Sequence, residues 1–139
     1  TIGLNQLKSL DKNNAKRKKN LSLFLSLIDK NIYRADFNLK GSCNYAFPLI
    51  LNEPDLKLRK ILENTLIKKG IEFRRGNAGG GNQLRQPYLK SFLKNINLEN
   101  FKEVDHIHFF GYYIGNYPDL TEKKIKKICS ILNSIQYDL

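Results

Sequence analysis

Methionine and tryptophan are absent from the 139 residues, and cysteine occurs only twice. Cys43 and Cys129 are far apart, and neither has a CxxC or histidine-rich neighbourhood. A disulfide framework or a zinc site is therefore not expected, and both thiols are predicted to be reduced. No apolar run approaches the roughly 20 residues that cross a bilayer, and the amino terminus lacks a signal-peptide pattern. We expect a cytoplasmic protein with no membrane partner.

Acidic residues are also scarce, with 13 Asp and Glu against 24 Lys and Arg, for a formal net charge of +11. This excess is compatible with nucleic acid, an acidic membrane surface or a phosphorylated small molecule as a partner. The chain is also rich in Lys, Asn and Ile, as expected from an AT-rich genome, which inflates basic charge without a functional cause. Charge alone does not select a partner class.

The length is that of one domain, and a hydrophobic fraction of 41% suffices for a core. The chain opens inside an apolar-periodic stretch, with Ile2, Leu4, Leu7 and Leu10 at helical spacing. A chain that starts part-way along a helix resembles a fragment. We predict a single domain over residues 1–139, in which residues 1–30 form leading helices that continue from a missing part and residues 31–139 form a sheet-and-helix unit.

Helical patterns recur along the chain. Asp11 is predicted to cap a helix that runs through Lys30, whose basic first half is either a solvated face or a patch that faces an anion or a subunit. A second helix is predicted from near Pro54 to Gly70, a short one after Pro87, and a last one capped by Thr121.

Three segments have strand character and predict a three-stranded sheet backed by helices. They are Cys43–Leu51, Ile71–Arg75 and Phe109–Tyr117. Pro48 has no amide donor, so the first strand is predicted at a sheet edge or a bulge. Phe73, Phe92 and Tyr113 are predicted to lie in the core.

Residues 76–86 form a glycine-rich segment with flanking and internal polar residues. Glycines allow close approach of backbone to a ligand, and guanidinium groups suit phosphate or carboxylate. The segment lacks the GKS or GKT of a Walker loop and the GxGxxG spacing of a dinucleotide fingerprint. It is predicted to bind an anion, the alternative being a flexible surface loop, and its amide side chains Asn77, Asn82 and Gln83 favour the former because they add directional hydrogen bonding.

Two histidines, His106 and His108, follow Asp105 at a spacing that could bind metal on a strand. No third ligand is evident in the sequence, so a structural or substrate-facing role is favoured and no metal site is assigned.

Three motifs, in order, resemble the DegT/StrS-type nucleotide-sugar aminotransferases. The opening Ile2-Gly3-Leu4-Asn5-Gln6-Leu7 through Leu10-Asp11, followed by the basic helix, resembles a family segment that comes after the cofactor-binding domain. Gly76-Asn77 through Gln86-Pro87 resembles the family's G-N-x-x-x-Q-P loop, with Arg85 before Gln-Pro as in the 3-dehydrases of nucleotide-linked 4-keto-6-deoxysugars. His108 to Pro118 resembles its His-x-x-Gly and Gly-Asn-x-Pro segment, while the inserted Ala78–Gly81 stretch lengthens the loop.

The resemblance implies the α/β small carboxy-terminal domain of a fold-type-I enzyme, with a mainly antiparallel sheet, closing over a nucleotide-sugar substrate in cell-surface polysaccharide or deoxysugar biosynthesis. Pyridoxal phosphate or pyridoxamine phosphate would be held by the missing amino-terminal domain, and the full-length enzyme would be a homodimer. The lysine or histidine that acts on the cofactor lies upstream in the family, so this chain has no catalytic residue and is expected to be inactive alone. The substrate-binding residues implied here are Arg75, Asn77, Asn82, Gln83, Arg85 and His108.

Two other function classes remain open. A small nucleic-acid-binding module would use the basic first helix and exposed aromatic residues, but no RNP, KH or zinc-finger signature is present. A dimerisation domain would self-associate without binding a ligand. Whether the parent enzyme transaminates or dehydrates, and on which sugar, is left open by the sequence.

Overall fold

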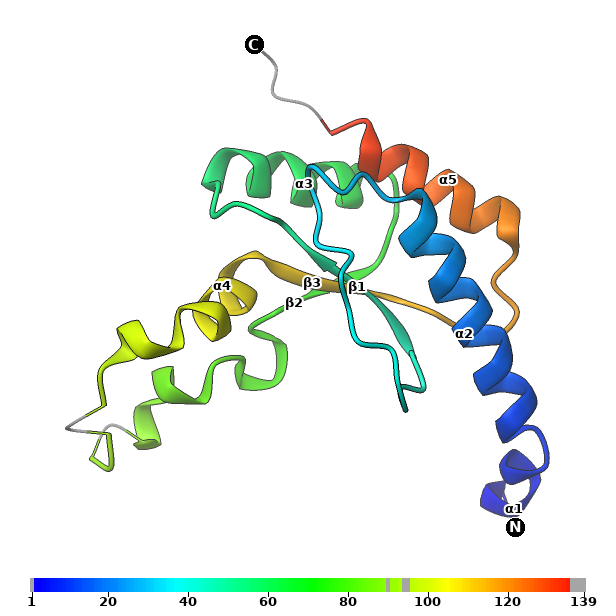
Figure 1. Ribbon diagram of the computed structural model, residues 1–139, viewed down its shortest axis with the longest axis horizontal. Helices are drawn as coiled ribbons and strands as arrows, with labels where there is room; N and C mark the ends of the chain where they lie inside the picture. The colour runs from blue at the N-terminus through cyan, green and yellow to red at the C-terminus, as the bar shows by residue number, and fades with distance from the viewer. Residues whose placement is uncertain (1, 90, 94–95, 136–139) are drawn as a thin grey trace.

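The computed structural model of the protein describes residues 2–89, 91–93 and 96–135. Its helices and strands follow one another along the chain as shown in Figure 1. They are α1 (Ile2–Leu7), α2 (Leu10–Leu27), β1 (Ala46–Ile50), α3 (Leu56–Lys68), β2 (Phe73–Arg75), α4 (Lys102–Phe110), β3 (Gly111–Gly115) and α5 (Glu122–Asn133). Short 3₁₀ helices lie at Ala78–Gly80, Gln83–Arg85, Pro87–Leu89 and Leu98–Phe101.

The three strands form one antiparallel sheet in the order β1-β3-β2. The last strand is therefore central, and Tyr113 pairs with Pro48 on one side and Arg74 on the other. The predicted three-stranded sheet is confirmed, as is the edge position of the proline-containing strand. A central strand would lose a ladder hydrogen bond at proline, whereas an edge strand has a free side on which no donor is needed.

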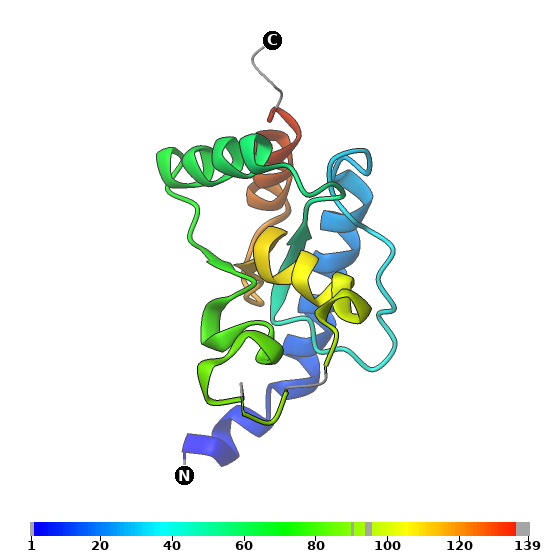
Figure 2. The ribbon, with the colours of Figure 1, turned by 90° about the vertical axis from the view of Figure 1, so that its left-hand side faces the viewer.

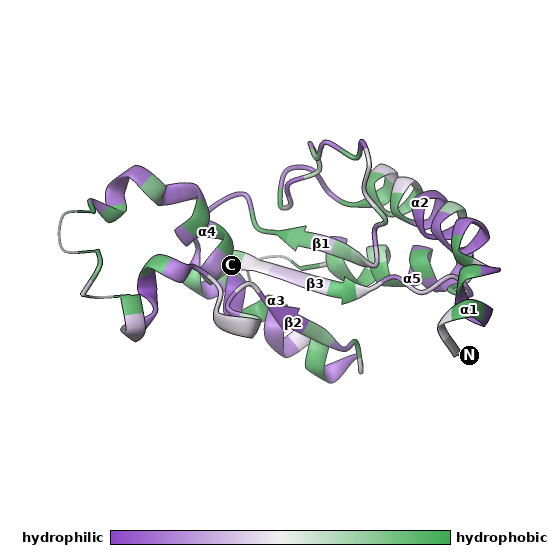
Figure 3. Ribbon diagram, turned by 90° about the horizontal axis from the view of Figure 1, so that it is seen from below, coloured by the Kyte–Doolittle hydropathy of each residue, from purple (hydrophilic) through white to green (hydrophobic). Residues whose placement is uncertain are grey.

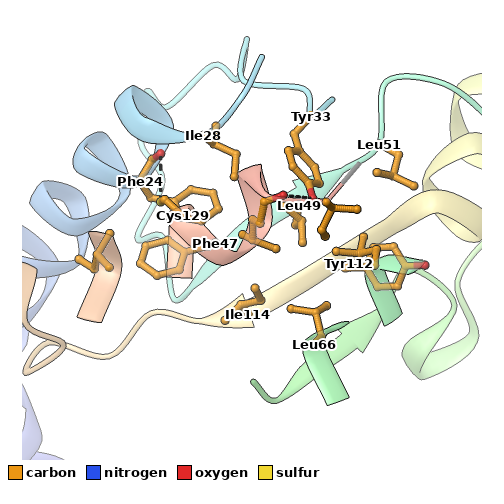
Figure 4. Close-up of a cluster of buried hydrophobic side chains, with 14 of the residues drawn as sticks. Phe24, Ile28, Tyr33, Phe47, Leu49, Leu51, Leu66, Tyr112, Ile114 and Cys129 are labelled. Atoms are coloured by element: carbon orange, nitrogen blue, oxygen red, sulfur yellow. Dashed lines mark hydrogen bonds between the residues drawn. The ribbon is translucent and has the colours of Figure 1, made fainter. Parts of the chain in front are cut away.

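Helices α2, α3 and α5 contribute to a single core on one face of the sheet. Alternate strand residues Phe47, Leu49, Tyr112 and Ile114 are buried and belong to the same cluster as residues of the three helices. Figure 4 shows these side chains converging between the strands and α2, with Phe24 stacked on Phe47 at a ring distance of 4.5 Å. The residues that alternate with these along the strands lie on the other face of the sheet, among them Pro48, Tyr113 and Arg74.

Helix α2 starts and ends at other residues than predicted. Its N-cap residue is Ser9, and Asp11 lies in the first turn, where a carboxylate is favourable beside the helix dipole. The helix ends at Leu27 and not at Lys30, because the Asn133 side chain of α5 bonds both the Leu27 carbonyl, at 2.8 Å, and the Asp29 amide, at 2.9 Å. A tertiary contact thus ends a helix whose sequence pattern continues.

The two other long helices begin as the sequence predicts. The Asp55 carboxylate accepts from the amides of Lys57 and Leu58 at the start of α3, and the Thr121 hydroxyl accepts from the Lys124 amide at the start of α5. Gly70 follows α3 with a φ of +64°, a conformation that glycine adopts without strain.

Residues 76–89, 91–93 and 96–110 project from the sheet, and we call them the arm. Figure 2 shows the glycine-rich segment beneath α4. The prediction that Phe109 begins a strand is wrong, since residues 102–110 are helical and the strand starts at Gly111. The helix after Pro87 is confined to a single 3₁₀ turn, and Phe92, expected in the core, is 80% exposed.

The arm and the helix pair α2 and α5 lie at opposite ends of the long axis (Figures 1 and 3). Between them, Figure 3 shows hydrophobic residues in β1 and near the end of β3. No helix in the described ranges is long and apolar enough to cross a membrane.

Candidate functional site

The glycine-rich segment packs closely against α4, and two of its glycines are required for that packing. The Gly76 amide donates to the Gly111 carbonyl, and a Cβ at Gly76 would lie 1.9 Å from the Ile107 carbonyl oxygen. Gly81 has a φ of +62°, and a Cβ there would lie 2.3 Å from His108 Nδ1. Any side chain at these positions would push the segment off α4.

Three of the six predicted site residues meet at this contact. The buried Asn82 side chain donates from Nδ2 to Asp105 Oδ1 at 2.7 Å, and its backbone amide donates to His108 Nδ1 at 3.0 Å. Arg85 makes a bidentate pair with Asp105, from Nε to Oδ1 and from one terminal nitrogen to Oδ2, each at 2.6 Å. We call Asn82, Arg85, Asp105 and His108 the loop cluster.

Charge in the loop cluster is balanced internally. The hydrogen bond from Arg85, helped by that from Asn82, holds the pKa of the Asp105 carboxyl below its usual range although partial burial opposes this. The same hydrogen bond raises the pKa of Arg85. The guanidinium carbon also lies 4.9 Å from the centre of the Phe109 ring, a cation–π distance. Arg85 is 38% exposed, so it is oriented by protein groups while it still faces solvent.

The other three predicted residues lie outside the loop cluster. The Arg75 guanidinium pairs with Glu63 of α3 at 2.5 Å. Asn77 is exposed, and its carbonyl accepts a hydrogen bond from the Gly80 amide. Gln83 is exposed and accepts a hydrogen bond from the Tyr88 hydroxyl.

Glu63 links Arg75 to the body of the protein. It accepts a hydrogen bond from Tyr112 at 2.7 Å and pairs with Arg59 at 3.2 Å. Burial opposes its ionisation, but the hydrogen bonds from Tyr112 and Arg59 and the charge of Arg75 lower its pKa overall. Arg75 therefore joins β2 to α3, and its 48% exposed side chain still reaches solvent.

Asp105 is the member of the loop cluster that sequence reasoning considered only as a metal ligand. A signal for it is the i, i+3 spacing to His108, which places the two side chains on one face of a helix, whereas the metal hypothesis rests on the i, i+2 spacing of the two histidines on a strand. The two histidines have different partners, because His106 Nε2 contacts the Leu51 carbonyl oxygen at 2.6 Å while His108 contacts Asn82. Among the described residues no group of three potential ligands could hold a metal ion.

A cavity of about 470 Å³ lies beside the glycine-rich segment, between it and residues 37–46. Gly76 and Ala78 form its wall on the arm, Pro48 and Tyr113 lie on the sheet, and Asn38 and Ser42 add polar groups on the far side. This volume, with mostly apolar walls and few polar groups, is that of a site for a small molecule.

The asparagine of the Gly-Asn-x-Pro motif is part of the folded body and not of this cavity. Asn116 is 1% exposed, and its side chain donates to the carbonyls of Arg17 and Asn44 and accepts from Asn20. It therefore ties the end of β3 to α2 and to the start of β1, as a buried amide must when all its polar atoms need partners.

The comparisons with known proteins support the resemblance seen in the motifs. No protein-family model matches the sequence. The chain is 29% identical over 132 residues, which is 94% of the chain, to GDP-4-keto-6-deoxy-D-mannose 3-dehydratase of Yersinia pseudotuberculosis, of which it covers 33%. The solved structure of an E. coli GDP-4-keto-6-deoxy-D-mannose-3-dehydratase with bound hydrated PLP superposes with a TM-score of 0.75 at 25% identity, over 94% of this chain and 33% of that one. These matches confirm the resemblance to the DegT/StrS-type family.

Another solved structure agrees in fold. A Helicobacter pylori aminotransferase involved in the biosynthesis of pseudoaminic acid superposes with a TM-score of 0.72 at 18% identity, over 94% of this chain and 34% of that chain. The chain thus spans about a third of the length of the DegT/StrS-type relatives it matches. The expected antiparallel small-domain fold is confirmed.

Proposed function

We propose that this chain is the carboxy-terminal small domain of a pyridoxal- or pyridoxamine-phosphate-dependent enzyme that acts on nucleotide-linked sugars as an aminotransferase or a 3-dehydrase. The observation that carries the proposal is the match over 94% of the chain to one third of a GDP-sugar dehydratase. Residues 1–30 would lead in from the missing part, and residues 31–139 would close over the substrate.

The substrate would lie against the arm and in the adjoining cavity. Asn82 is buried, and its side-chain amide donates to Asp105 and accepts from the Leu84 amide. Its role would therefore be to hold the loop in place. Arg85 uses two of the roughly five N–H donors of a guanidinium on Asp105, which leaves about three for an anionic group of the substrate. Arg75, Asn77 and Gln83 would add contacts from exposed positions, and His108 would lie near the sugar.

The described residues do not fit the cofactor itself. A lysine that forms a Schiff base needs a desolvated site, and none of the described lysines is buried. The cofactor, which supplies an electron sink when bound, would therefore belong to the missing domain. This chain's residues would bind and orient the sugar nucleotide and exclude water from it.

The arm also carries the surface that the missing domain would cover. Several apolar side chains of the arm are exposed, namely Tyr88, Phe92, Ile96, Leu98, Phe101, Val104, Ile107 and Phe109. Exposed apolar side chains gathered on one projecting element are typical of a protein contact. We extend the proposal to a homodimeric, cytoplasmic full-length enzyme of cell-surface polysaccharide or deoxysugar biosynthesis.

A chimera tests this function. The chain replaces the corresponding third of the Yersinia dehydratase, and the product is assayed for cofactor absorbance, oligomeric state and consumption of GDP-4-keto-6-deoxymannose and other 4-keto sugar nucleotides. We expect a dimer that binds the cofactor and consumes at least one of these substrates, whereas the dehydratase without its last third does not. A folded chimera that binds the cofactor and consumes none of the panel contradicts the proposal.

A further inference from the structure

A second cavity, of about 560 Å³, lies where β2, β3 and the first half of α5 approach one another, and we call it the basic groove. Its apolar lining includes Phe73, Ile114, Leu120, Ile128 and Ile131. No residue of the loop cluster and none of residues 76–110 lines it. It is therefore separate from the arm, and it adjoins the cavity beside the glycine-rich segment, with which it shares Tyr45, Ala46 and Tyr113.

Four cations line the basic groove, namely Lys69, Arg74, Lys124 and Lys127, against a single acid, Glu72. In the part of the chain that the structure describes, none of these five side chains takes part in an ion pair. Elsewhere in the described ranges some cations have acidic partners, such as Arg59, Arg75 and Arg85, and others, such as Lys123 and Lys126, have none, but those others do not line a common cavity with the four cations of the groove. Positive charge is thus uncompensated at this cavity, where apolar walls strengthen its field.

Three tyrosines also line the basic groove, namely Tyr45, Tyr113 and Tyr117. Tyr113 lies on the sheet face away from the helices, and its ring meets that of Tyr45 edge to face at a centroid distance of 6.0 Å. Tyr45 is 68% exposed, and Tyr117, which also lines the groove, is 48% exposed. The groove is therefore lined by tyrosines as well as by the four cations.

We propose that the basic groove binds a nucleoside phosphate, with the base against the tyrosine rings and the phosphates between the lysines and Arg74. Aromatic faces bind bases of any sequence, and ammonium and guanidinium groups bind phosphate. The volume fits a small molecule or one or two nucleotides of a strand. An acidic peptide would use the cations but leaves the clustered tyrosines unexplained, so it is an alternative that the experiment excludes or reveals.

The nucleoside phosphate has two possible sources, a free nucleotide and single-stranded nucleic acid. This inference goes beyond the proposed function and does not depend on it, because the four cations of the basic groove belong neither to the loop cluster nor to the lining of the cavity in which the substrate is proposed to lie. The chimera reports on turnover, whereas the experiment below reports on binding to the 139-residue chain.

The experiment is a titration of the 139-residue chain with GDP, ADP, guanosine, inorganic diphosphate and an acidic octapeptide, followed by calorimetry and by NMR shifts of backbone amides. We expect each nucleotide to bind at least about tenfold more tightly than guanosine, diphosphate or the peptide, since base and phosphate contacts act together. The shifted amides should be those of residues 69–74, 113–117 and 124–131. Equal affinity for diphosphate, preference for the peptide, or shifts confined to residues 76–89 overturns the proposal.

Helix α5 provides a matched pair of charge variants. Lys124→Gln with Lys127→Gln removes two cations of the basic groove, while Lys123→Gln with Lys126→Gln removes two exposed cations of the same helix that do not line it. The first pair should weaken nucleotide binding by about tenfold or more and the second by less than about twofold. Equal losses in the two pairs mean that diffuse charge alone attracts the nucleotide, which also overturns the proposal.

A single-stranded RNA octamer distinguishes the two sources. Binding of the octamer at least about tenfold more tightly than GDP, with a steep salt dependence, assigns the site to nucleic acid. Octamer affinity equal to or below that of GDP assigns it to a free nucleotide. Tight octamer binding that survives Lys124→Gln with Lys127→Gln places RNA elsewhere and contradicts nucleic acid as the source.

Discussion

The body and the arm are stabilised in different ways. In the body, three helices and two strands bury a common apolar cluster, and side chains such as Phe47 and Leu62 are 0% exposed. In the arm, apolar side chains point to solvent, and the glycine-rich segment is attached by backbone contacts and by one carboxylate, Asp105. Hydrophobic burial stabilises the body, whereas the glycine-rich segment of the arm depends on a few polar contacts that a partner or substrate can alter.

The same substitution in the two regions gives the largest expected contrast. Phe47→Ala should lower the free energy of unfolding by about 3–5 kcal/mol, because it leaves a cavity beside Phe24 in the core. Phe92→Ala, in the arm, should change it by less than about 0.5 kcal/mol, since that ring is exposed. Urea unfolding followed by far-UV circular dichroism measures both. Equal effects would mean that the arm is part of the same core.

The second contrast lies within the arm, between two glycines of positive φ. Gly81→Ala adds a Cβ that would meet His108 Nδ1 and the Asn77 Cα, so it should weaken loop docking by about 1–3 kcal/mol. Gly79→Ala, with a φ of +72° but open space, should cost only about 1 kcal/mol through backbone strain. Amide hydrogen exchange of residues 82–86 reports on docking. The distinction fails if both variants loosen these amides alike or if Gly81→Ala unfolds the body.

The body was largely predictable from the sequence, and the reason is its periodicity. Apolar residues at helical spacing between Asp55 and Gly70, and alternation around Phe73, are signals of burial that local sequence carries. The end of α2 was not predictable, because it depends on Asn133, about a hundred residues away. Such long-range polar contacts leave no pattern in the neighbourhood of the residue they affect.

The arm was predicted less well, since its chemistry is ambiguous in sequence. Glycines allow the backbone to approach a ligand closely, but here they allow the glycine-rich segment to approach α4. The sequence alone does not distinguish these two uses of glycine. Aromatic residues at Phe109 and Phe110 suggested a strand, whereas acids at Glu103 and Asp105 in the first turn favour the observed helix. Which residues the substrate contacts remains a prediction.

A third test concerns pH and the carboxylate that attaches the loop. The pKa of Asp105 is lowered in the folded arm, so docking is fully stabilised above the ordinary aspartate pKa and weakens as pH falls through the lower folded value. We expect the amide signals of residues 82–86 to change below about pH 4, as the Asp105 carboxylate is protonated. Asp105→Asn should remove this acid step and weaken docking by about 1–2 kcal/mol at neutral pH. Both proteins retain His108, so their difference isolates the carboxylate.

At Arg85 a small effect on stability should accompany a large effect on function, because this residue carries the arm's proposed contact with the substrate. Its guanidinium is 38% exposed and paired on one side only, so Arg85→Ala should lower the free energy of unfolding by less than about 1 kcal/mol. In the chimera, loss of a charge-assisted hydrogen bond to the substrate should lower kcat/KM by about tenfold to a hundredfold.

Arg85→Lys keeps the charge but not the bidentate geometry, so it should recover little of that loss. Asn77→Ala, on the exposed side of the loop, should change stability as little and kcat/KM less than Arg85→Ala. If Arg85→Ala instead unfolds the chain while the folded remainder keeps normal kcat/KM, Arg85 serves only to hold the loop on Asp105, and the substrate contact belongs to another residue.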